Sequence, residues 1–168
     1  RRIRAWALCG TRMRATRTRS ASPRTTGSAC PLSSDRVPLQ AHPWLTVDGL
    51  VLHESKLVAV IRRNAPFEGM PALPGGFVEL GETTERAVVR EVQEETGLET
   101  RILRLVGVYS NPGRDPRGHT ISVAYALERI GGELRAASDA EGIALLDPDR
   151  LPTMAFDHAK IIGDWRRA

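Results

Sequence analysis

The 168-residue sequence predicts a single α/β domain over residues 41–168. Its length suits one ordinary domain with a substantial core. Apolar runs of strand length alternate along the chain with two segments of helical periodicity, and this interleaving is typical of layered α/β folds. Residues 1–40 show neither pattern and therefore lie outside the predicted domain.

Residues 1–40 form a basic segment rich in Arg, Ser, Thr and Pro, and this composition predicts disorder. The segment holds nine arginines and one acidic residue, which leaves 15 basic and 19 acidic residues in the other 128. It resembles a transit peptide, would equally suit a stretch upstream of the true gene start, and as a basic arm could touch RNA or DNA. We expect it to take no part in the chemistry, and we expect no nucleic-acid partner.

Both cysteines, Cys9 and Cys30, lie in that segment, so the domain contains no thiol and suits a reducing cytosol. No stretch of the sequence reaches the roughly 18 consecutive apolar residues that a membrane-spanning helix needs. We therefore expect a soluble, cytoplasmic protein without a membrane partner.

The domain is expected to begin near Trp44 with two strands that are joined by a short turn. A helix-periodic segment and two further strands follow, and the second of these strands alternates larger with smaller side chains. A last short strand then precedes a closing helix, whose apolar side includes Ile161, Ile162 and Trp165. The predicted strands cover 44–52, 56–62, 102–109, 119–127 and 141–146, and the predicted helices cover 83–97 and 155–167.

The first predicted helix carries an unusual set of glutamates. Thr83 can cap its N-terminus, and Gly97 can adopt the left-handed conformation that ends a helix. At 100° per residue, Glu91, Glu94 and Glu95 fall within one arc at the edge of the core-facing stripe. Three carboxylates are therefore expected to lie side by side next to the hydrophobic core.

Seven glutamates and only two arginines lie between residues 79 and 99, although like charges three and four positions apart destabilise a helix. Arg90 can pair with Glu94, but the other carboxylates need a cation, and oxygen ligands at this density suit Mg²⁺ or Mn²⁺. Such ions neutralise phosphate oxygens and activate bound water, while Gly75 and Gly76 allow backbone groups to approach closely. This equipment suits phosphoryl-type hydrolysis, whereas a merely solvated acidic helix would leave the repulsion unexplained.

The spacing around this helix resembles a known signature. Gly76, five residues, Glu82, seven residues and then the segment 90–98, Arg-Glu-Val-Gln-Glu-Glu-Thr-Gly-Leu, match every position of the Nudix box. This resemblance to the Nudix family implies an α-β-α sandwich with a mixed sheet. It also implies that Arg90 orients a glutamate, that Glu82 braces the loop, and that Glu91 is a provisional general base. The metal ligands that it implies are Gly76, Glu91, Glu94 and Glu95.

The substrate must be identified from features outside the box. The predicted loop 110–119 offers Arg114 and Arg117, which can fork onto phosphate, and His119 at its exit. An ordinary surface turn whose arginines pair with nearby acids is the alternative. The segments 73–79, 115–119 and 155–158 are similar to the ADP-ribose pyrophosphatase branch of the family, which implies cleavage of ADP-ribose to AMP and ribose 5-phosphate.

Five more residues are candidates with equally ordinary alternatives. Arg62 ends a strand and is a candidate for substrate binding. Asp139 and Glu141 could supply a metal ligand or a base, or could simply be solvated. Asp157 and His158 could belong to the site, or could be a helix cap and a satisfied surface histidine.

Two other functions stay open for a domain of this kind. The chain could hydrolyse oxidised nucleoside triphosphates, as the MutT branch does, or it could sense ADP-ribose without cutting it. An RNA-directed role of the basic segment would give affinity that falls steeply with salt. A small nucleotide-like molecule is the expected partner of the domain, whether it is an enzyme or a sensor. The resemblance also suggests a homodimer.

Overall fold

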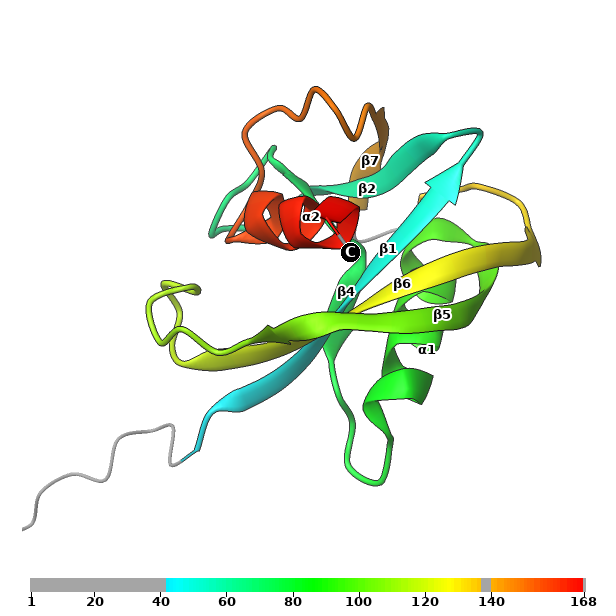
Figure 1. The fold of residues 1–168 in the computed structure, drawn as a ribbon. Coiled ribbons are helices and arrows are strands. Elements are labelled where there is room, and N and C mark those ends of the chain that lie inside the picture. The colour runs from blue at the N-terminus through cyan, green and yellow to red at the C-terminus, as the bar shows by residue number, and fades with distance from the viewer. Residues whose placement is uncertain (1–41, 137–139, 168) are drawn as a thin grey trace, which may run out of the picture. The chain divides into compact units, whose positions relative to one another are not determined.

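The computed structural model describes residues 42–136 and 140–167, and it shows a mixed sheet with two helices (Figure 1). The predictions for residues 1–40 and for Asp139 lie outside these residues. The helices are α1 (Thr84–Thr96) and α2 (His158–Arg167). The strands are β1 (Trp44–His53), β2 (Lys56–Arg62), β3 (Pro71–Ala72), β4 (Gly75–Phe77), β5 (Leu98–Tyr109), β6 (Thr120–Gly132) and β7 (Ala140–Leu146).

Strand β1 is the central strand of the sheet. The strand order is β3-β2-β1-β6-β5, with β4 also paired to β1 and β7 also paired to β2. β1 runs parallel to β6 from Trp44 to Val51 and antiparallel to both β4 and β2. The predicted mixed sheet is therefore confirmed.

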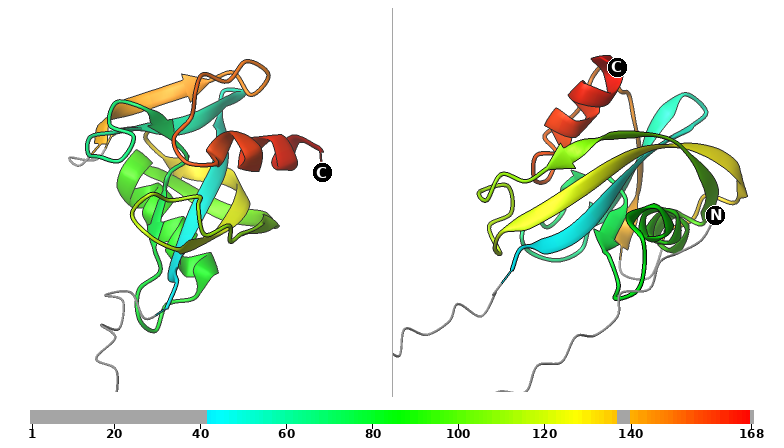
Figure 2. Two further views of the ribbon diagram at one scale, coloured as in Figure 1. Left: turned by 90° about the vertical axis from the view of Figure 1, so that its left-hand side faces the viewer. Right: turned by 60° about the horizontal axis from the view of Figure 1, so that its bottom comes forward.

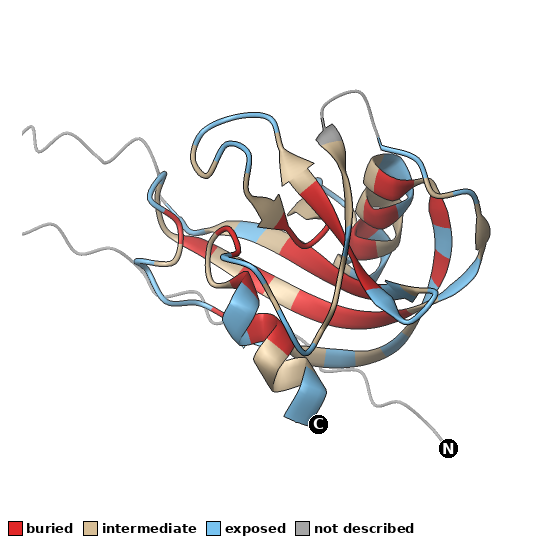
Figure 3. Cartoon of the chain, turned by 90° about the horizontal axis from the view of Figure 1, so that it is seen from above, coloured by how far each residue is buried: buried red, intermediate tan, exposed pale blue. Residues whose placement is uncertain are grey.

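Two hydrophobic clusters lie on opposite faces of this sheet, because successive side chains of a strand point to opposite sides. Val47 and Val51 of β1 join the cluster that includes Val88 and Val92 of α1. Leu50 of β1 joins the second cluster, which contains two isoleucines of α2. Figure 2 shows α1 and α2 on opposite sides of the central strands, and Figure 3 shows the buried residues along their inner faces. The two clusters define the predicted sandwich.

The ends of α1 follow the local sequence. The hydroxyl of Thr83 accepts a hydrogen bond from the backbone N–H of Arg86 at 3.3 Å, and Gly97 ends the helix with a φ of 74°. Helix α1 then packs closely on β1, where a side chain at Gly49 would lie 2.5 Å from Val92. A glycine at position 49 therefore lets the helix approach the sheet.

Three boundaries differ from the sequence-based expectation. β5 begins at Leu98, directly after the helix, and β6 continues to Gly132, so this pair is longer than predicted. Helix α2 begins at His158 rather than at 155, because Phe156 has a φ of 51°, which no right-handed helix contains. The short strands β3 and β4 were not predicted. Neither helix in the described residues is long and apolar enough to span a membrane.

Candidate active site

Arg90 is the central connection of the glutamate-rich helix. Its Nε and Nη2 donate to the carboxylate of Glu82 at 3.0 and 2.9 Å, and its Nη1 donates to Glu91 at 2.8 Å and Glu94 at 3.0 Å. Its Nη2 also donates to the carbonyl of Phe77 at 3.2 Å. The hydrogen bond to Glu82 raises the pKa of Arg90 and lowers the pKa of Glu82. One guanidinium thus ties the glycine-containing loop to three carboxylates.

Glu91 lies under Gly76, which explains the glycine at this position. A side chain at Gly76 would lie 2.5 Å from the carboxyl group of Glu91. The Glu91 side chain is only 15% exposed, and this burial raises its pKa even though Arg90 opposes the effect. A partly buried carboxylate with a raised pKa is suited to receive a proton or to bind a cation.

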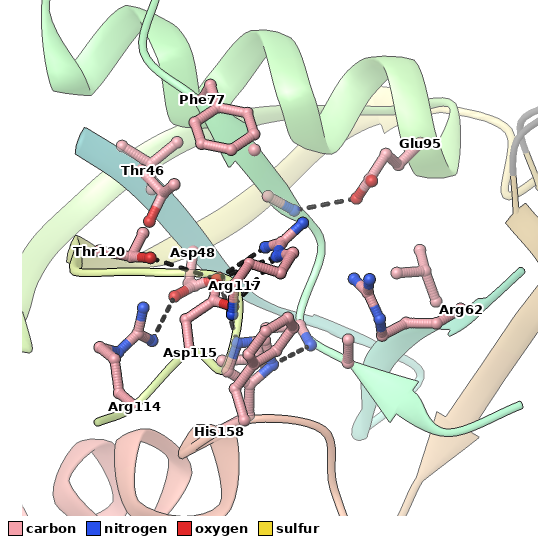
Figure 4. A pocket seen from close by; sticks show the side chains of 17 residues that line it. Thr46, Asp48, Arg62, Phe77, Glu95, Arg114, Asp115, Arg117, Thr120 and His158 are labelled. Atoms are coloured by element: carbon pink, nitrogen blue, oxygen red, sulfur yellow. Dashed lines mark hydrogen bonds and ion pairs between the residues drawn. The ribbon is translucent and has the colours of Figure 1, made fainter. Parts of the chain in front are cut away.

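Glu95 faces the other glycine of the loop. The backbone N–H of Gly75 donates to Glu95 Oε2 at 2.9 Å, and Glu95 lines a pocket (Figure 4). A side chain at Gly75 would collide with the carbonyl oxygen of Val47, 2.0 Å away. The two glycines therefore let strand β4 lie between β1 and the carboxylates of α1.

The oxygen donors around Gly76 fit a hard divalent metal in kind. Glu91 and Glu95 flank the loop, where Glu91 accepts a hydrogen bond from Arg90 and Glu95 accepts one from the backbone N–H of Gly75. The Glu94 side chain is 59% exposed and lies against Arg90. Among the described residues, no group of three acidic or imidazole side chains is already gathered around one point.

The opposite wall of the pocket is formed by arginines. Arg62, at the end of β2, donates from Nε to the carbonyl of Pro66 at 2.8 Å. Arg117, from the loop between β5 and β6, forms a bidentate pair with the buried Asp115 at 2.7–3.2 Å. Both line the same pocket as Glu95, which has a volume of about 130 Å³ and is partly open to solvent.

The floor of the pocket is a buried polar network around Asp48. Asp48 accepts a hydrogen bond from the hydroxyl of Ser122, and its other oxygen lies 3.4 Å from Nε2 of His158. Arg114 reaches Asp48 at 3.6 Å and forms a bidentate pair with Asp157 at 2.6–3.2 Å. Its side chain is only 4% exposed, so this is an interior ion pair.

The structure gathers several predicted residues into one pocket and leaves others outside it. Glu95, Gly76, Arg62, Arg114, Arg117 and His158 line the pocket (Figure 4). Glu82, Glu91 and Glu94 lie beside it, within the hydrogen-bonding network of Arg90. The His119 ring nitrogen lies 3.2 Å from the carbonyl of Ser110, and the residue is not among those that line the pocket. Glu141 belongs to β7, but its side chain lies outside the described part of the chain.

Two expectations about single residues need correction. His158 is not a surface histidine, since it is 3% exposed and its Nδ1 accepts from the backbone N–H of Leu73 at 2.8 Å. The Asp157 side chain is bound to Arg114, and it is the Asp157 carbonyl oxygen that accepts from the first turn of α2. The alternative for loop 110–119 was a surface turn whose arginines pair with nearby acids. Both arginines do pair with acids, but the Arg114 side chain is buried rather than on the surface.

Sequence reasoning missed several residues that line the pocket. Asp48 was the one acid in an apolar strand segment, and this was a signal that could have been used. Asp115 and Thr120 flank Arg117, and their burial is set by tertiary contacts. Phe77 is exposed at the pocket rim and packs edge-on against Trp44, with ring centroids 6.0 Å apart. The further lining residues that were not named as site candidates are Thr46, Val47, Val60, Ala72, Leu73 and Phe156, although Leu73 and Phe156 belong to the segments 73–79 and 155–158.

Comparisons with known proteins agree with this geometry. A family model described as NUDIX domain matches residues 42–165. The chain therefore belongs to the Nudix family, and it is a Nudix hydrolase. It is 54% identical over 129 residues to an ADP-ribose pyrophosphatase of Methanocaldococcus jannaschii, a match that covers 77% of this chain and 76% of the relative.

Solved structures show the same fold. A MutT/nudix family protein from Enterococcus faecalis has 32% identity and a TM-score of 0.65, over 77% of this chain and 63% of that chain. The NUDIX domain of Shewanella oneidensis NrtR, complexed with ADP ribose, has 27% identity and a TM-score of 0.66, over 75% of this chain and 88% of that chain.

Proposed function

We propose that this protein hydrolyses ADP-ribose to AMP and ribose 5-phosphate with the help of Mg²⁺ or Mn²⁺. The observation that carries the proposal is a single pocket with Glu95 and the glycine loop on one wall and Arg62 and Arg117 on the other. An acidic wall and a cationic wall suit a metal-bound diphosphate, whose charge must be matched from both sides. The identity to an ADP-ribose pyrophosphatase supports this choice of substrate.

The divalent ion would be held by Glu91, Glu95 and the carbonyl of Gly76, with Glu94 within reach of the same helix face. When bound, it would neutralise phosphate oxygens and lower the pKa of a coordinated water. Glu91 is partly buried and Gly75 holds Glu95 in place, so both carboxylates are oriented toward the glycine loop before any ion binds.

The remaining residues bind and orient the substrate. Arg62 and Arg117 are suited to the diphosphate, because a guanidinium forms directional hydrogen bonds with phosphate oxygens. Arg90 orients Glu91 and Glu94 through Nη1. Glu91 is our candidate for the general base, since burial raises the affinity of its carboxylate for a proton.

The test is product formation from ADP-ribose, NADH, diadenosine polyphosphates and 8-oxo-dGTP, each with Mg²⁺ and with a chelator. We expect preferential, metal-dependent release of AMP from ADP-ribose. Preferential turnover of 8-oxo-dGTP would favour the MutT-like alternative. Binding of ADP-ribose without turnover of any compound would favour the sensor, and either result would reject the proposed activity.

A cytoplasmic location and a homodimer remain predictions from the sequence. Size-exclusion chromatography with light scattering would measure the mass of the assembly in solution. A mass of one chain would reject the homodimer.

A further inference from the structure

The ring of Phe156 contacts both arginines of the cationic wall. The guanidinium carbon of Arg62 lies 4.9 Å from the centre of the Phe156 ring, and that of Arg117 lies 5.5 Å from the same centre. Both distances fall within the roughly 6 Å range in which a cation is attracted to an aromatic ring. One ring thus interacts with two positive charges that repel each other.

Each of the two arginines is also anchored by hydrogen bonds from its Nε and Nη2 groups. Arg62 uses Nε and Nη2 to donate to the carbonyl oxygens of Pro66 and Asn64. Arg117 uses Nε and Nη2 to donate to the carboxylate of Asp115. The Nη1 group takes part in neither set of bonds, so each guanidinium keeps one donor group that these anchors do not use.

The position of Phe156 is imposed by an uncommon backbone conformation. Its φ of 51° lies in the left-handed region, which bulky residues rarely adopt. Phe67 packs edge-on against it at 4.8 Å and also has a positive φ, of 66°. Such conformations persist where the surrounding structure enforces them, and they are concentrated at ligand-binding sites.

Acidic side chains also lie near the two cations. Asp115 pairs with Arg117, while Glu95 on the opposite wall also acts on Arg62. Burial lowers the pKa of Arg62 most, and repulsion by the neighbouring Arg117 lowers it further, while Asp115 and Glu95 oppose the shift. An anion placed against both guanidiniums would relieve this repulsion.

We propose that Phe156 is a positioning residue that holds Arg62 and Arg117 as an anion-binding pair for the diphosphate of the substrate. This inference rests on the proposed function only for the identity of the substrate. The ring attracts each guanidinium and so restrains both, so that an oxyanion meets both donors without a prior rearrangement.

The chain offers a matched control for this role. Phe67 has the same side chain and a similar left-handed backbone, and both phenylalanines pack against the small cluster of Val60, Ala72 and Ala155. Among the described residues, the ring that both guanidiniums of Arg62 and Arg117 contact is that of Phe156. Substituting either phenylalanine by leucine therefore removes similar packing, but only Phe156→Leu removes the ring that the arginines share.

The experiment compares the full chain with Phe156→Leu, Phe156→Tyr and Phe67→Leu. Calorimetry with inorganic pyrophosphate and a chelator measures anion binding, steady-state kinetics with ADP-ribose and Mg²⁺ measure KM and kcat, and thermal unfolding reports the cost to stability. We expect Phe156→Leu to raise the Kd for pyrophosphate and the KM by about three- to tenfold, and to lower kcat by less. Phe156→Tyr should keep both values near those of the wild type.

Phe67→Leu should lower the unfolding temperature about as much as Phe156→Leu while leaving the Kd near that of the wild type. Equal effects of the two leucine variants on the Kd would show a merely structural role and overturn the proposal, as would no effect or no binding of pyrophosphate by the wild type. If pyrophosphate binding depends on Phe156 but ADP-ribose is not cut, the proposed function fails and this inference stands. If ADP-ribose is cut but neither the Kd for pyrophosphate nor the KM depends on Phe156, the proposed function stands and this inference fails.

Discussion

Asp115 is a buried carboxylate whose charge is matched by several donors. It accepts hydrogen bonds from the guanidinium and the backbone N–H of Arg117 and from the hydroxyl of Thr120. Burial by itself would raise the pKa of Asp115, but these hydrogen bonds outweigh it and lower the pKa below its ordinary value. The ionised form therefore stabilises the fold above the pKa of the unfolded chain, near 4, and this stability is lost as the pH falls through the folded-state pKa.

Asp115→Asn is expected to lower the free energy of unfolding at pH 7 by about 1–3 kcal/mol, because it removes hydrogen bonds to a charged group. The difference between wild type and variant should shrink as the pH falls below about 4, where the wild-type carboxylate also becomes protonated. Urea denaturation at pH 7, 5 and 3 measures this difference. A difference that is the same at all three pH values would contradict the assigned role of the charge.

Glu95→Gln is expected to reduce kcat by roughly two to three orders of magnitude, because it removes one charge from the proposed metal site. The fold should survive, since the amide oxygen of glutamine can still accept the hydrogen bond from Gly75. Steady-state kinetics at moderate Mg²⁺ and circular dichroism test both parts. Glu99→Gln, which removes an exposed charge elsewhere, serves as the control, and wild-type rates in Glu95→Gln would reject the site.

At the scale of the elements, His158 connects the start of α2 to the segment between β3 and β4. Leu73 donates its backbone N–H to Nδ1, so Nδ1 is the acceptor and Nε2 carries the proton that faces Asp48. Burial lowers the pKa of His158, and Asp48 only partly opposes this effect. The neutral imidazole thus stabilises the fold above the unfolded-state pKa, near 6.5, and this stability decreases as the pH falls from there toward the lower folded-state pKa.

His158→Asn is expected to lower the free energy of unfolding by about 1–3 kcal/mol at pH 7.5, where the wild-type imidazole is neutral. Because asparagine does not titrate, the variant should lack the part of the acid sensitivity that His158 contributes, at most about 1.4 kcal/mol per pH unit. Chemical denaturation at several pH values between 7.5 and 5.5 should therefore show the two proteins becoming more alike in stability. Parallel stability curves would show that His158 does not stay neutral in the fold.

The elements that could be predicted from the sequence are those with strong local signals. Helix α1 has a threonine cap, a closing glycine and a 3.6-residue periodicity, and the observed helix matches the expected one within a residue at either end. Strands β3 and β4 could not be predicted, because two or three residues carry no periodic pattern. Their pairing is determined by close approach to β1 and β2, as the contact between Gly75 and Val47 shows.

The candidate site divides in the same way. The acidic wall follows from one helix face and one motif, so the placement of Glu91 and Glu95 on the same side of the helix could be predicted from spacing. The cationic wall and the floor bring together residues far apart in sequence, such as Arg62 with Phe156 and Asp48 with Ser122. Such pairings depend on the sheet order, which the sequence pattern does not specify.

At the scale of the whole chain, residues 1–40 are expected to be dispensable for the chemistry. The pocket that holds Glu95 and Arg117 is lined by residues between positions 46 and 158. A chain that begins at residue 41 should therefore turn over ADP-ribose with a kcat/KM within about twofold of that of the full chain. For comparison, a tenfold change in kcat/KM would correspond to about 1.4 kcal/mol. Kinetics of both proteins, with thermal unfolding to verify the fold, measure this. A large loss of activity in a folded truncation would assign the basic segment a role in the reaction.

Strand β1 contributes to both hydrophobic clusters, to the floor of the pocket and to the pairing of three other strands. Its backbone amides between Thr46 and Val51 can therefore become exposed to solvent only when both faces of the sheet separate. In hydrogen–deuterium exchange these amides should be among the last to exchange, at a rate that follows global unfolding rather than local fluctuation. Because β1 also carries Asp48 and pairs with Gly75 and Gly76, unfolding of this strand should disrupt the pocket as well.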